Sequence, residues 1–134
     1  MTQIFREFFI DIEPVPASRP RVSRWGTYYG KRYERFRRTV KPLLTPYSGE
    51  VLKGPLAVHL DFFVKPPKRL SRLFPRGDID NYAKGPLDSM TNHGGFWIDD
   101  DQITELFASK QYAEGGNYGI NIRIRRGKNN PSSV

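Results

Sequence analysis

Alternating hydrophobic and polar positions predict four β-strands, over residues 4–13, 55–64, 102–112 and 118–125. The second is the clearest, because Leu56, Val58 and Leu60 recur at every second position. Hydrophobic side chains at this spacing share one face of a strand, so each strand is expected to bury one face. The segment Glu114-Gly115-Gly116-Asn117 separates the last two strands and predicts the tight turn of a β-hairpin.

Two α-helices are predicted between these strands, over residues 31–44 and 80–91. The first carries a sparse apolar stripe that includes Phe36 and Val40. The second contains Pro86, which lacks an N–H donor and whose ring crowds a preceding carbonyl group, so a kink there or a frayed first turn is expected. The order β-α-β-α-β-β indicates a small single α/β (α+β) domain with a mixed sheet and two helices.

The chain of 134 residues fits one compact domain, expected over residues 1–126 with a disordered tail at residues 127–134. Residues 17–32 and 65–76 are basic, contain proline and are expected to be loops. No stretch approaches the ~18 apolar residues that would span a bilayer, and the N-terminus lacks the features of a signal peptide. With no cysteine, there is no disulfide framework and no zinc–thiolate site. These features predict a cytoplasmic protein, of a bacterium or, for a phage-encoded chain, of the infected host cell.

Charge favours a polyanionic partner. The formal net charge is +8, and basic side chains gain affinity for nucleic acid by releasing phosphate counterions. A membrane surface is disfavoured, since no basic amphipathic helix is seen, and a basic surface kept for solubility is the plain alternative. Residues 78–105 hold seven acids against one lysine, a net −6, whereas the rest holds 21 basic residues against seven acids, a net +14. An acidic island in so basic a chain suits a cation site within a phosphate-binding surface.

The basic residues best placed to contact DNA lie in the two predicted loops and the first helix: Arg19, Arg21, Arg24, Lys31, Arg32, Arg35, Lys68, Arg69, Arg72 and Arg76. Trp25, Tyr28 and Tyr29 are interleaved with them and fit either of two roles. Such rings stack on unpaired bases at a branch point, or they pack in the protein core. His59, on a strand face, and His93, in a turn, lack metal-ligand spacing and receive no role.

Two acidic clusters suggest a metal site for phosphodiester hydrolysis. Asp78 and Asp80 stand at the start of the second predicted helix, and Asp99-Asp100-Asp101 offers a third carboxylate. Mg²⁺ prefers carboxylate and water oxygens and takes few protein ligands. A calcium loop of the EF-hand type is excluded, because Tyr82 and Ala83 stand where an oxygen ligand and glycine are needed. The first pair alone equally fits a turn whose Asp80 caps the helix.

Lys84 and Asp88 follow Asp80 at steps of four residues and so share one helix face with it. Lys84 fits a cation directed at the scissile phosphate or its leaving group, or else an ordinary surface ion pair with Asp80. Asp88 fits three roles: orienting Lys84, supporting a metal ligand, or simple solvation. Between the acidic clusters, Phe96-Trp97 is expected to pack in the core and so fix the direction of Asp100.

Two longer runs place both acidic clusters in a fixed pattern. They read Arg76-Gly77-Asp78-Ile79-Asp80-Asn81-Tyr82-Ala83-Lys84-Gly85-Pro86-Leu87-Asp88 and Gly95-Phe96-Trp97-Ile98-Asp99-Asp100-Asp101-Gln102-Ile103. The pattern is D-x-D-N-x-x-K-x-x-x-D, a gap, an aromatic pair, a D-D pair and Q-hydrophobic, which is far more specific than D-x-D alone. In these runs and in its predicted element order, the chain resembles the RusA family of Holliday-junction resolvases, which are crossover junction endodeoxyribonucleases.

This resemblance implies a homodimeric, magnesium-dependent endonuclease that resolves four-way junctions and related branched DNA by paired nicks. Mn²⁺ is expected to substitute for Mg²⁺, and no organic cofactor is implied. The resemblance assigns the metal-site carboxylates to Asp78, Asp80 and Asp100, and the lysine of the family pattern to Lys84. These four residues are the expected catalytic set.

The chain also departs from the family pattern at two places. Gly85-Pro86 replaces good helix formers, which affects the placing of the lysine. A third aspartate follows the D-D pair, so that Asp100 and Asp101 are alternatives for the third ligand. Asp99 matches the first member of the pair, and it is expected, with Asp88 and Asp101, to support the ligands.

Two other functions fit parts of the sequence. A non-catalytic DNA- or RNA-binding module with structural acids explains the basic shell but leaves the acidic island as a cost to affinity. A nuclease that acts on ordinary duplexes or flaps would use the same chemistry on another substrate.

Overall fold

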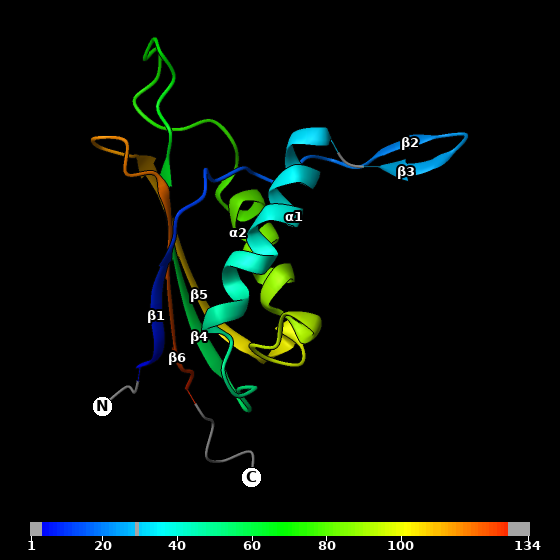
Figure 1. Cartoon of the computed structure of the whole chain (residues 1–134), viewed down its shortest axis with the longest axis vertical. Coiled ribbons are helices and arrows are strands. Elements are labelled where there is room, and N and C mark those ends of the chain that lie inside the picture. The colour runs from blue at the N-terminus through cyan, green and yellow to red at the C-terminus, as the bar shows by residue number, and fades with distance from the viewer. Residues whose placement is uncertain (1–3, 29, 129–134) are drawn as a thin grey trace.

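A mixed four-stranded sheet forms the centre of the computed structural model, which describes residues 4–28 and 30–128. Its strands are β1 (Ile4–Ile10), β4 (Leu56–Val64), β5 (Ile103–Tyr112) and β6 (Gly119–Arg126), in the spatial order β1-β6-β4-β5 (Figure 1). The pair β4 and β5 is parallel, and the other two pairs are antiparallel. The predicted α+β class with a mixed sheet is therefore confirmed.

Two helices lie on one side of this sheet, α1 (Lys31–Leu44) and α2 (Ile79–Met90) (Figure 1). Parallel strands need a crossover connection, and α2 supplies it between β4 and β5. The predicted bounds of α1 are confirmed, and α2 begins and ends one residue earlier than predicted. Three short 3₁₀ helices complete the helical content of the described residues: Thr45–Tyr47, Asn92–Gly94 and Asp100–Gln102.

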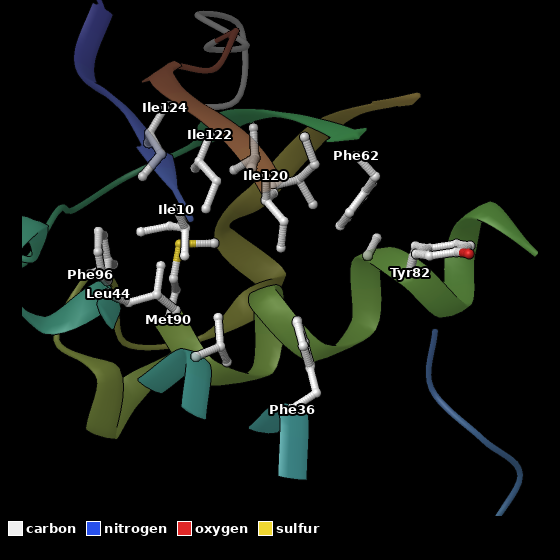
Figure 2. Close-up of a cluster of buried hydrophobic side chains, with 14 of the residues drawn as sticks. Ile10, Phe36, Leu44, Phe62, Tyr82, Met90, Phe96, Ile120, Ile122 and Ile124 are labelled. Atoms are coloured by element: carbon white, nitrogen blue, oxygen red, sulfur yellow. The ribbon is translucent and has the colours of Figure 1, made fainter. Parts of the chain in front are cut away.

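The core lies between the sheet and the helices (Figure 2). Every second residue of the central strands points into it, as in Leu60 of β4 and Ile122 of β6, both fully buried. Phe36 from α1 and Met90 from α2 meet them from the other side. Phe96 and Trp97 are also fully buried, which confirms the core role predicted for this pair.

Pro86 does not interrupt α2, which remains helical from its first turn to Met90. The prediction of a frayed first turn is wrong. The close packing of Phe36 explains why glycine precedes the proline, because a Cβ atom at Gly85 would lie 2.9 Å from Cε1 of Phe36. The Gly85-Pro86 pair is buried and lets α2 approach α1 closely.

The predicted hairpin between the last two strands is wrong. Residues 114–117 do form a turn, closed by a 3.1 Å hydrogen bond from the Asn117 N–H to the Glu114 carbonyl. However, β4 lies between β5 and β6, so the two strands joined by this turn are not hydrogen-bonded neighbours. The largely buried β4 lies between them, and the glycine-rich turn passes its end.

A second, smaller sheet was not predicted. Strands β2 (Arg21–Ser23) and β3 (Gly26–Tyr28) form an antiparallel hairpin inside the segment expected to be a loop. Figure 1 shows this hairpin projecting from the body beyond the start of α1. Tyr29, one of the aromatic residues considered above, lies outside the described residues.

The two ends of the chain complete the description. Gly127, one residue beyond the expected domain boundary, donates a 2.9 Å hydrogen bond to the carbonyl of Pro55. The rest of the expected tail, from residue 129, lies outside the described residues. Across the described ranges, no helix is both long and apolar enough to cross a membrane.

Candidate active site

The first acidic pair lies at the start of α2. Asp78 is the N-cap residue, with extended backbone angles, and its carbonyl accepts hydrogen bonds from the N–H groups of Asn81 and Tyr82. Its side chain makes no capping hydrogen bond, although aspartate is among the preferred residues for that role. Asp80 lies in the first turn and is not the cap, so the capping role predicted for it is wrong. Both carboxylates are exposed and both face the positive end of the helix dipole.

Three side chains tether the backbone that leads into Asp78. Lys110 of β5 donates hydrogen bonds to the carbonyl groups of Pro75, at 2.7 Å, and of Gly77. Tyr112 donates to the carbonyl of Phe74 at 2.9 Å. From α2, the Tyr82 hydroxyl group donates to the carbonyl of Arg76 at 2.6 Å. The end of the basic loop is therefore fixed to the sheet and to the helix.

Gly77 is required at the last step before the acidic pair. Its φ angle of 99° lies in the left-handed region that other residues rarely adopt. A Cβ atom there would also lie 3.0 Å from the Pro16 ring and 3.0 Å from Cε2 of Tyr82. The close approach of these two rings sets the direction in which the chain enters α2.

Lys84 is exposed on the face of α2 that also carries Asp80 and Asp88. The ion pairs found across residues 4–28 and 30–128 are Arg32–Glu13 and Arg123–Glu7. The alternative interpretation of Lys84, a surface ion pair with Asp80, is therefore not seen.

The second acidic cluster forms a short capped turn before β5. Asp99 accepts a 3.0 Å hydrogen bond from the Asp101 N–H, and the Gln102 side chain accepts from the Asp99 N–H in return. Gln102 also donates to the carbonyl groups of Leu52 and Gly54, both at 3.1 Å. Asp99 and Gln102 thus hold the turn in place, and its other two aspartates, Asp100 and Asp101, are exposed.

The pKa of Asp100 is raised above its usual range. The largest cause is a hydrogen bond shared with the Asp99 carboxyl group, followed by partial desolvation and by the negative charges of Asp99, Asp88 and Asp101. Asp100 thus lies in negative surroundings, and repulsion of this kind favours a bound cation. Asp88, whose role was left open, contributes to the field at Asp100.

The two acidic clusters lie at opposite ends of α2. The Phe96 N–H donates to the Met90 carbonyl, and the Asn92 N–H donates to the Trp97 carbonyl. These hydrogen bonds hold the segment before the second cluster at the end of this helix. A helix of this length separates its ends by about 18 Å. Accordingly, no three acidic or histidine side chains among the described residues are grouped to hold a metal ion. One chain supplies oxygen donors of the type that Mg²⁺ prefers, but does not gather Asp78, Asp80 and Asp100 in one place.

A comparison with protein families assigns the chain. The model of the family described as endodeoxyribonuclease RusA matches residues 11–125, which is most of its length. This chain belongs to the RusA family. Membership implies an endonuclease that resolves Holliday junctions, and it confirms the resemblance found in the sequence. No curated protein matches the chain.

Basic side chains of this RusA-family chain line an open groove of about 670 Å³ beside the first acidic pair. The groove lies between residues 13–16 and the loop of residues 65–77, and its lining includes Lys65, Lys68, Arg72 and Arg76. Another groove, of about 640 Å³, lies between α1 and the end of α2. It contains Arg37, Arg38 and Lys41 as well as Asp88. Cationic side chains suited to phosphate therefore adjoin the first acidic pair, and others lie beside Asp88.

The predicted DNA-binding residues are distributed over the β2–β3 hairpin and its flanks, α1 and the loop of residues 65–77. Those with described side chains are exposed or partly exposed: Arg19, Arg24, Lys31, Arg32, Arg35, Lys68, Arg69, Arg72 and Arg76. Arg32 is also paired with Glu13 at 3.0 Å. The side chains of Arg21 and Tyr28 are not described. Trp25 is 85% exposed, so the interpretation of this residue as a core aromatic is wrong.

Sequence reasoning missed the residues that position the site. Lys110 and Tyr112 look like ordinary strand residues, and only their register beside Phe62 and Val64 reveals that they point to the helical side of the sheet. The available signal was a lysine at an inward position of an alternating strand. Gln102 was noted only as part of the family pattern, and its role in the capped turn comes from the structure.

Proposed function

We propose that this chain cuts four-way DNA junctions by Mg²⁺-dependent hydrolysis, as a homodimer that makes paired nicks. The observation that carries the proposal is the position of Asp78 and Asp80, whose exposed carboxylates lie beside a basic groove. The Asp78 side chain is not used to cap α2, and Lys110 and Tyr82 hold the backbone just before it. A phosphate backbone in that groove would lie against the two carboxylates. Since carboxylates alone repel phosphate, a cation between them is required to hold the scissile phosphate for cutting, whereas the basic side chains bind the rest of the DNA.

Carboxylates of the two clusters are the proposed ligands. Asp78 and Asp80 supply two of them, and Asp100 is the proposed third, because a hydrogen bond with the Asp99 carboxyl group and the charges of nearby acids raise its pKa. A bound Mg²⁺ would neutralise charge on the phosphate and make a bound water more acidic. These hard oxygen donors would accept Mn²⁺ as well. Asp88, Asp99 and Asp101 support the third ligand through their charge or, for Asp99, through the hydrogen bonds of the turn.

The length of α2 supports a site shared by two copies of the chain. In one chain the first pair and Asp100 are separated by the whole helix, as described above. Two copies related by a twofold axis, with their α2 helices antiparallel, would bring the start of one helix beside the end of the other. Each of the two sites would then hold Asp78 and Asp80 of one copy and Asp100 of its partner.

Strand β5 supports one arrangement for such a dimer. It is an edge strand, and Leu106 and Phe107 on its opposite faces are each 47% exposed. Long exposed edge strands with apolar side chains readily pair with another chain. Antiparallel pairing of β5 with its own copy would bring the start of one strand, which follows the Asp99–Asp101 turn, toward the end of the other, where Lys110 lies. Because Lys110 holds the residue before Asp78, this pairing would bring the two parts of each shared site toward one another.

Lys84 is proposed to direct its charge at the scissile phosphate or its leaving group. It lies one helical turn after Asp80 on an exposed face, and no ion pair within the described part of the chain occupies its ammonium group. A cation at this position would stabilise the charge that develops as the phosphodiester bond breaks.

The direct test is cleavage of a synthetic four-way junction with Mg²⁺, with EDTA and with no added metal. The wild-type chain should make symmetric nicks only with Mg²⁺ or Mn²⁺, and Asp80→Asn should bind the junction without cutting it. Junction binding with no metal-dependent nicks by the wild-type chain would instead indicate a non-catalytic binding module. Linear duplexes and flaps in the same assay establish whether branched DNA is preferred.

A further inference from the structure

The β2–β3 hairpin forms an arm that is anchored beside the first acidic pair. The Gly30 N–H donates a 3.0 Å hydrogen bond to the Ser18 hydroxyl group, which closes the base of the arm. The Ala17 N–H, just before the arm, donates to the carbonyl of Asn81 at 2.8 Å. Asn81 directly follows Asp80 in the first turn of α2. The arm is therefore attached at the end of α2 where DNA cutting is proposed, and Figure 1 shows it extending away from there.

The tip of the arm is a defined turn that presents Trp25. The Ser23 hydroxyl group accepts a 3.1 Å hydrogen bond from the Trp25 N–H and donates one of 3.3 Å to the Gly26 carbonyl. Gly26 has a φ angle of 121°, which the turn requires and which other residues rarely adopt. Trp25 is 85% exposed and Val22 is 82% exposed. An extended strand from Ser18 would carry Trp25 roughly 23 Å from the base of the arm.

Charge identifies the kind of partner that the arm fits. Residues 18–32 contain five basic residues and no acid: Arg19, Arg21, Arg24, Lys31 and Arg32. The guanidinium group of Arg24 lies 5.1 Å from the centre of the Trp25 ring, so the exposed ring carries a cation over one side. A flat apolar ring within a wholly basic arm complements a polyanion that also offers flat apolar faces. Nucleic acid has both features.

Base faces are covered by their neighbours in a continuous duplex and become accessible where strands exchange. We propose that the arm grips branched DNA, its basic side chains on the phosphates and the Trp25 ring stacked on a base exposed at the branch point. This inference rests on the proposed function, because it takes branched DNA as the substrate. It makes Trp25 a residue that selects the branched structure, whereas the arginines of the arm add affinity for any DNA.

Tryptophan fluorescence tests this placement without any cutting. The chain has two tryptophans, of which Trp25 is 85% exposed and Trp97 is fully buried. With EDTA present, a four-way junction should quench the emission of the wild-type chain and protect it from acrylamide. A linear duplex of the same sequence should do so far less. The Trp25→Phe variant retains Trp97 as its one tryptophan, and because that ring is buried, its emission should not respond to either DNA.

Affinity measurements separate stacking from charge. Trp25→Ala should weaken junction binding roughly 10-fold and leave duplex binding unchanged, since stacking on one base contributes on that order. Val22→Ala removes an exposed apolar side chain from the same arm and should change neither affinity. Arg24→Ala should weaken both complexes. Equal losses for junction and duplex in Trp25→Ala, or no loss, would overturn the proposal.

The outcomes also distinguish this inference from the proposed function. If the junction quenches the fluorescence of a chain that never cuts with Mg²⁺, the proposed role of the arm is supported and the proposed nuclease function is rejected. Metal-dependent cutting of junctions by Trp25→Ala, with wild-type affinity and selectivity, would keep the nuclease and reject the arm.

Discussion

The ammonium group of Lys110 donates a hydrogen bond to the carbonyl of Gly77, the residue directly before Asp78. The same group reaches the Pro75 carbonyl, so one side chain on the edge strand sets the path of the chain into α2. The acidic pair is thus positioned from β5, although the two segments are distant in sequence. Substitutions that move Lys110 should therefore displace Asp78 at the proposed site.

Replacing Lys110 with methionine keeps the length of the side chain and removes its charge and hydrogen bonds. Loss of two charge-assisted hydrogen bonds should lower the free energy of unfolding by about 1–3 kcal/mol. Junction cleavage should fall by about 100-fold, because a displacement of the order of 1 Å in a catalytic group has such an effect. Thermal unfolding and single-turnover cleavage measure the two effects. Lys53→Met, at an exposed lysine far from the tether, is the control.

Mixing two inactive variants should restore cutting if the metal site is shared. A dimer of one Asp80→Asn chain and one Asp100→Asn chain has one site with both changes and one intact site. After random exchange of subunits, about one quarter of all sites should be intact. A nicking assay on a four-way junction should therefore show single nicks rather than paired ones.

Two further mixtures make this complementation specific. Asp78→Asn with Asp80→Asn damages both sites of every dimer and should stay inactive. The variant Asp101→Asn, tested alone, decides which aspartate is the third ligand. If Asp100 is the ligand, Asp101→Asn should still cut, whereas Asp100→Asn alone should not. If the Asp80→Asn and Asp100→Asn mixture makes no nicks after subunit exchange has been verified, this result would falsify the shared site.

A charge placed on the exposed edge of β5 should separate the proposed dimer. Leu106→Lys puts an ammonium group on that edge at a side chain already 47% exposed, so the cost to folding should be small. Analytical ultracentrifugation should show a monomer, with junction cutting lost. Phe9→Lys is the matched control, because Phe9 is 43% exposed on the opposite edge strand, β1. If Phe9→Lys rather than Leu106→Lys yields a monomer, the dimer forms through β1.

Gly85→Ala should destabilise the fold even though alanine favours a helix. The added methyl group would lie 2.9 Å from the Phe36 ring, and overpacking of this kind costs about 1–3 kcal/mol against a gain of about 1 kcal/mol in helix propensity. Chemical denaturation measures the difference. In a Phe36→Leu background the alanine should cost less, and an unchanged cost would place the strain elsewhere.

Local patterns predicted the body of the fold because its elements are governed by neighbours in sequence. The apolar stripe of α1 and the alternation of β4 gave their bounds within one residue. The order of strands in the sheet was harder, since the turn at residues 114–117 reveals where the chain reverses but not which strand lies between. The β2–β3 strands are three residues each and show no hydrophobic alternation in the sequence, so the pattern did not predict them.

The proposed site was predicted in its chemistry but not in its geometry. The residue types at Asp78, Asp80 and Asp100 carry the family pattern, which the family comparison supports. Their separation along α2 could not be anticipated, because spacing in sequence does not measure distance across a crossover. The Lys110 tether joins residues 33 positions apart and depends on the register of two parallel strands.

The central place of β6 has a consequence for synthesis of the chain. Of the described strands, β6 is the last to be synthesised, yet it lies between β1 and β4 and is hydrogen-bonded to both. The first strand therefore waits for residues 119–126 before it can join the sheet, and long-range pairing of this kind slows folding. A chain without residues 119–126 leaves β1 unpaired and removes Ile120, Ile122 and Ile124 from the core, so it completes neither the sheet nor the support on which the proposed site rests.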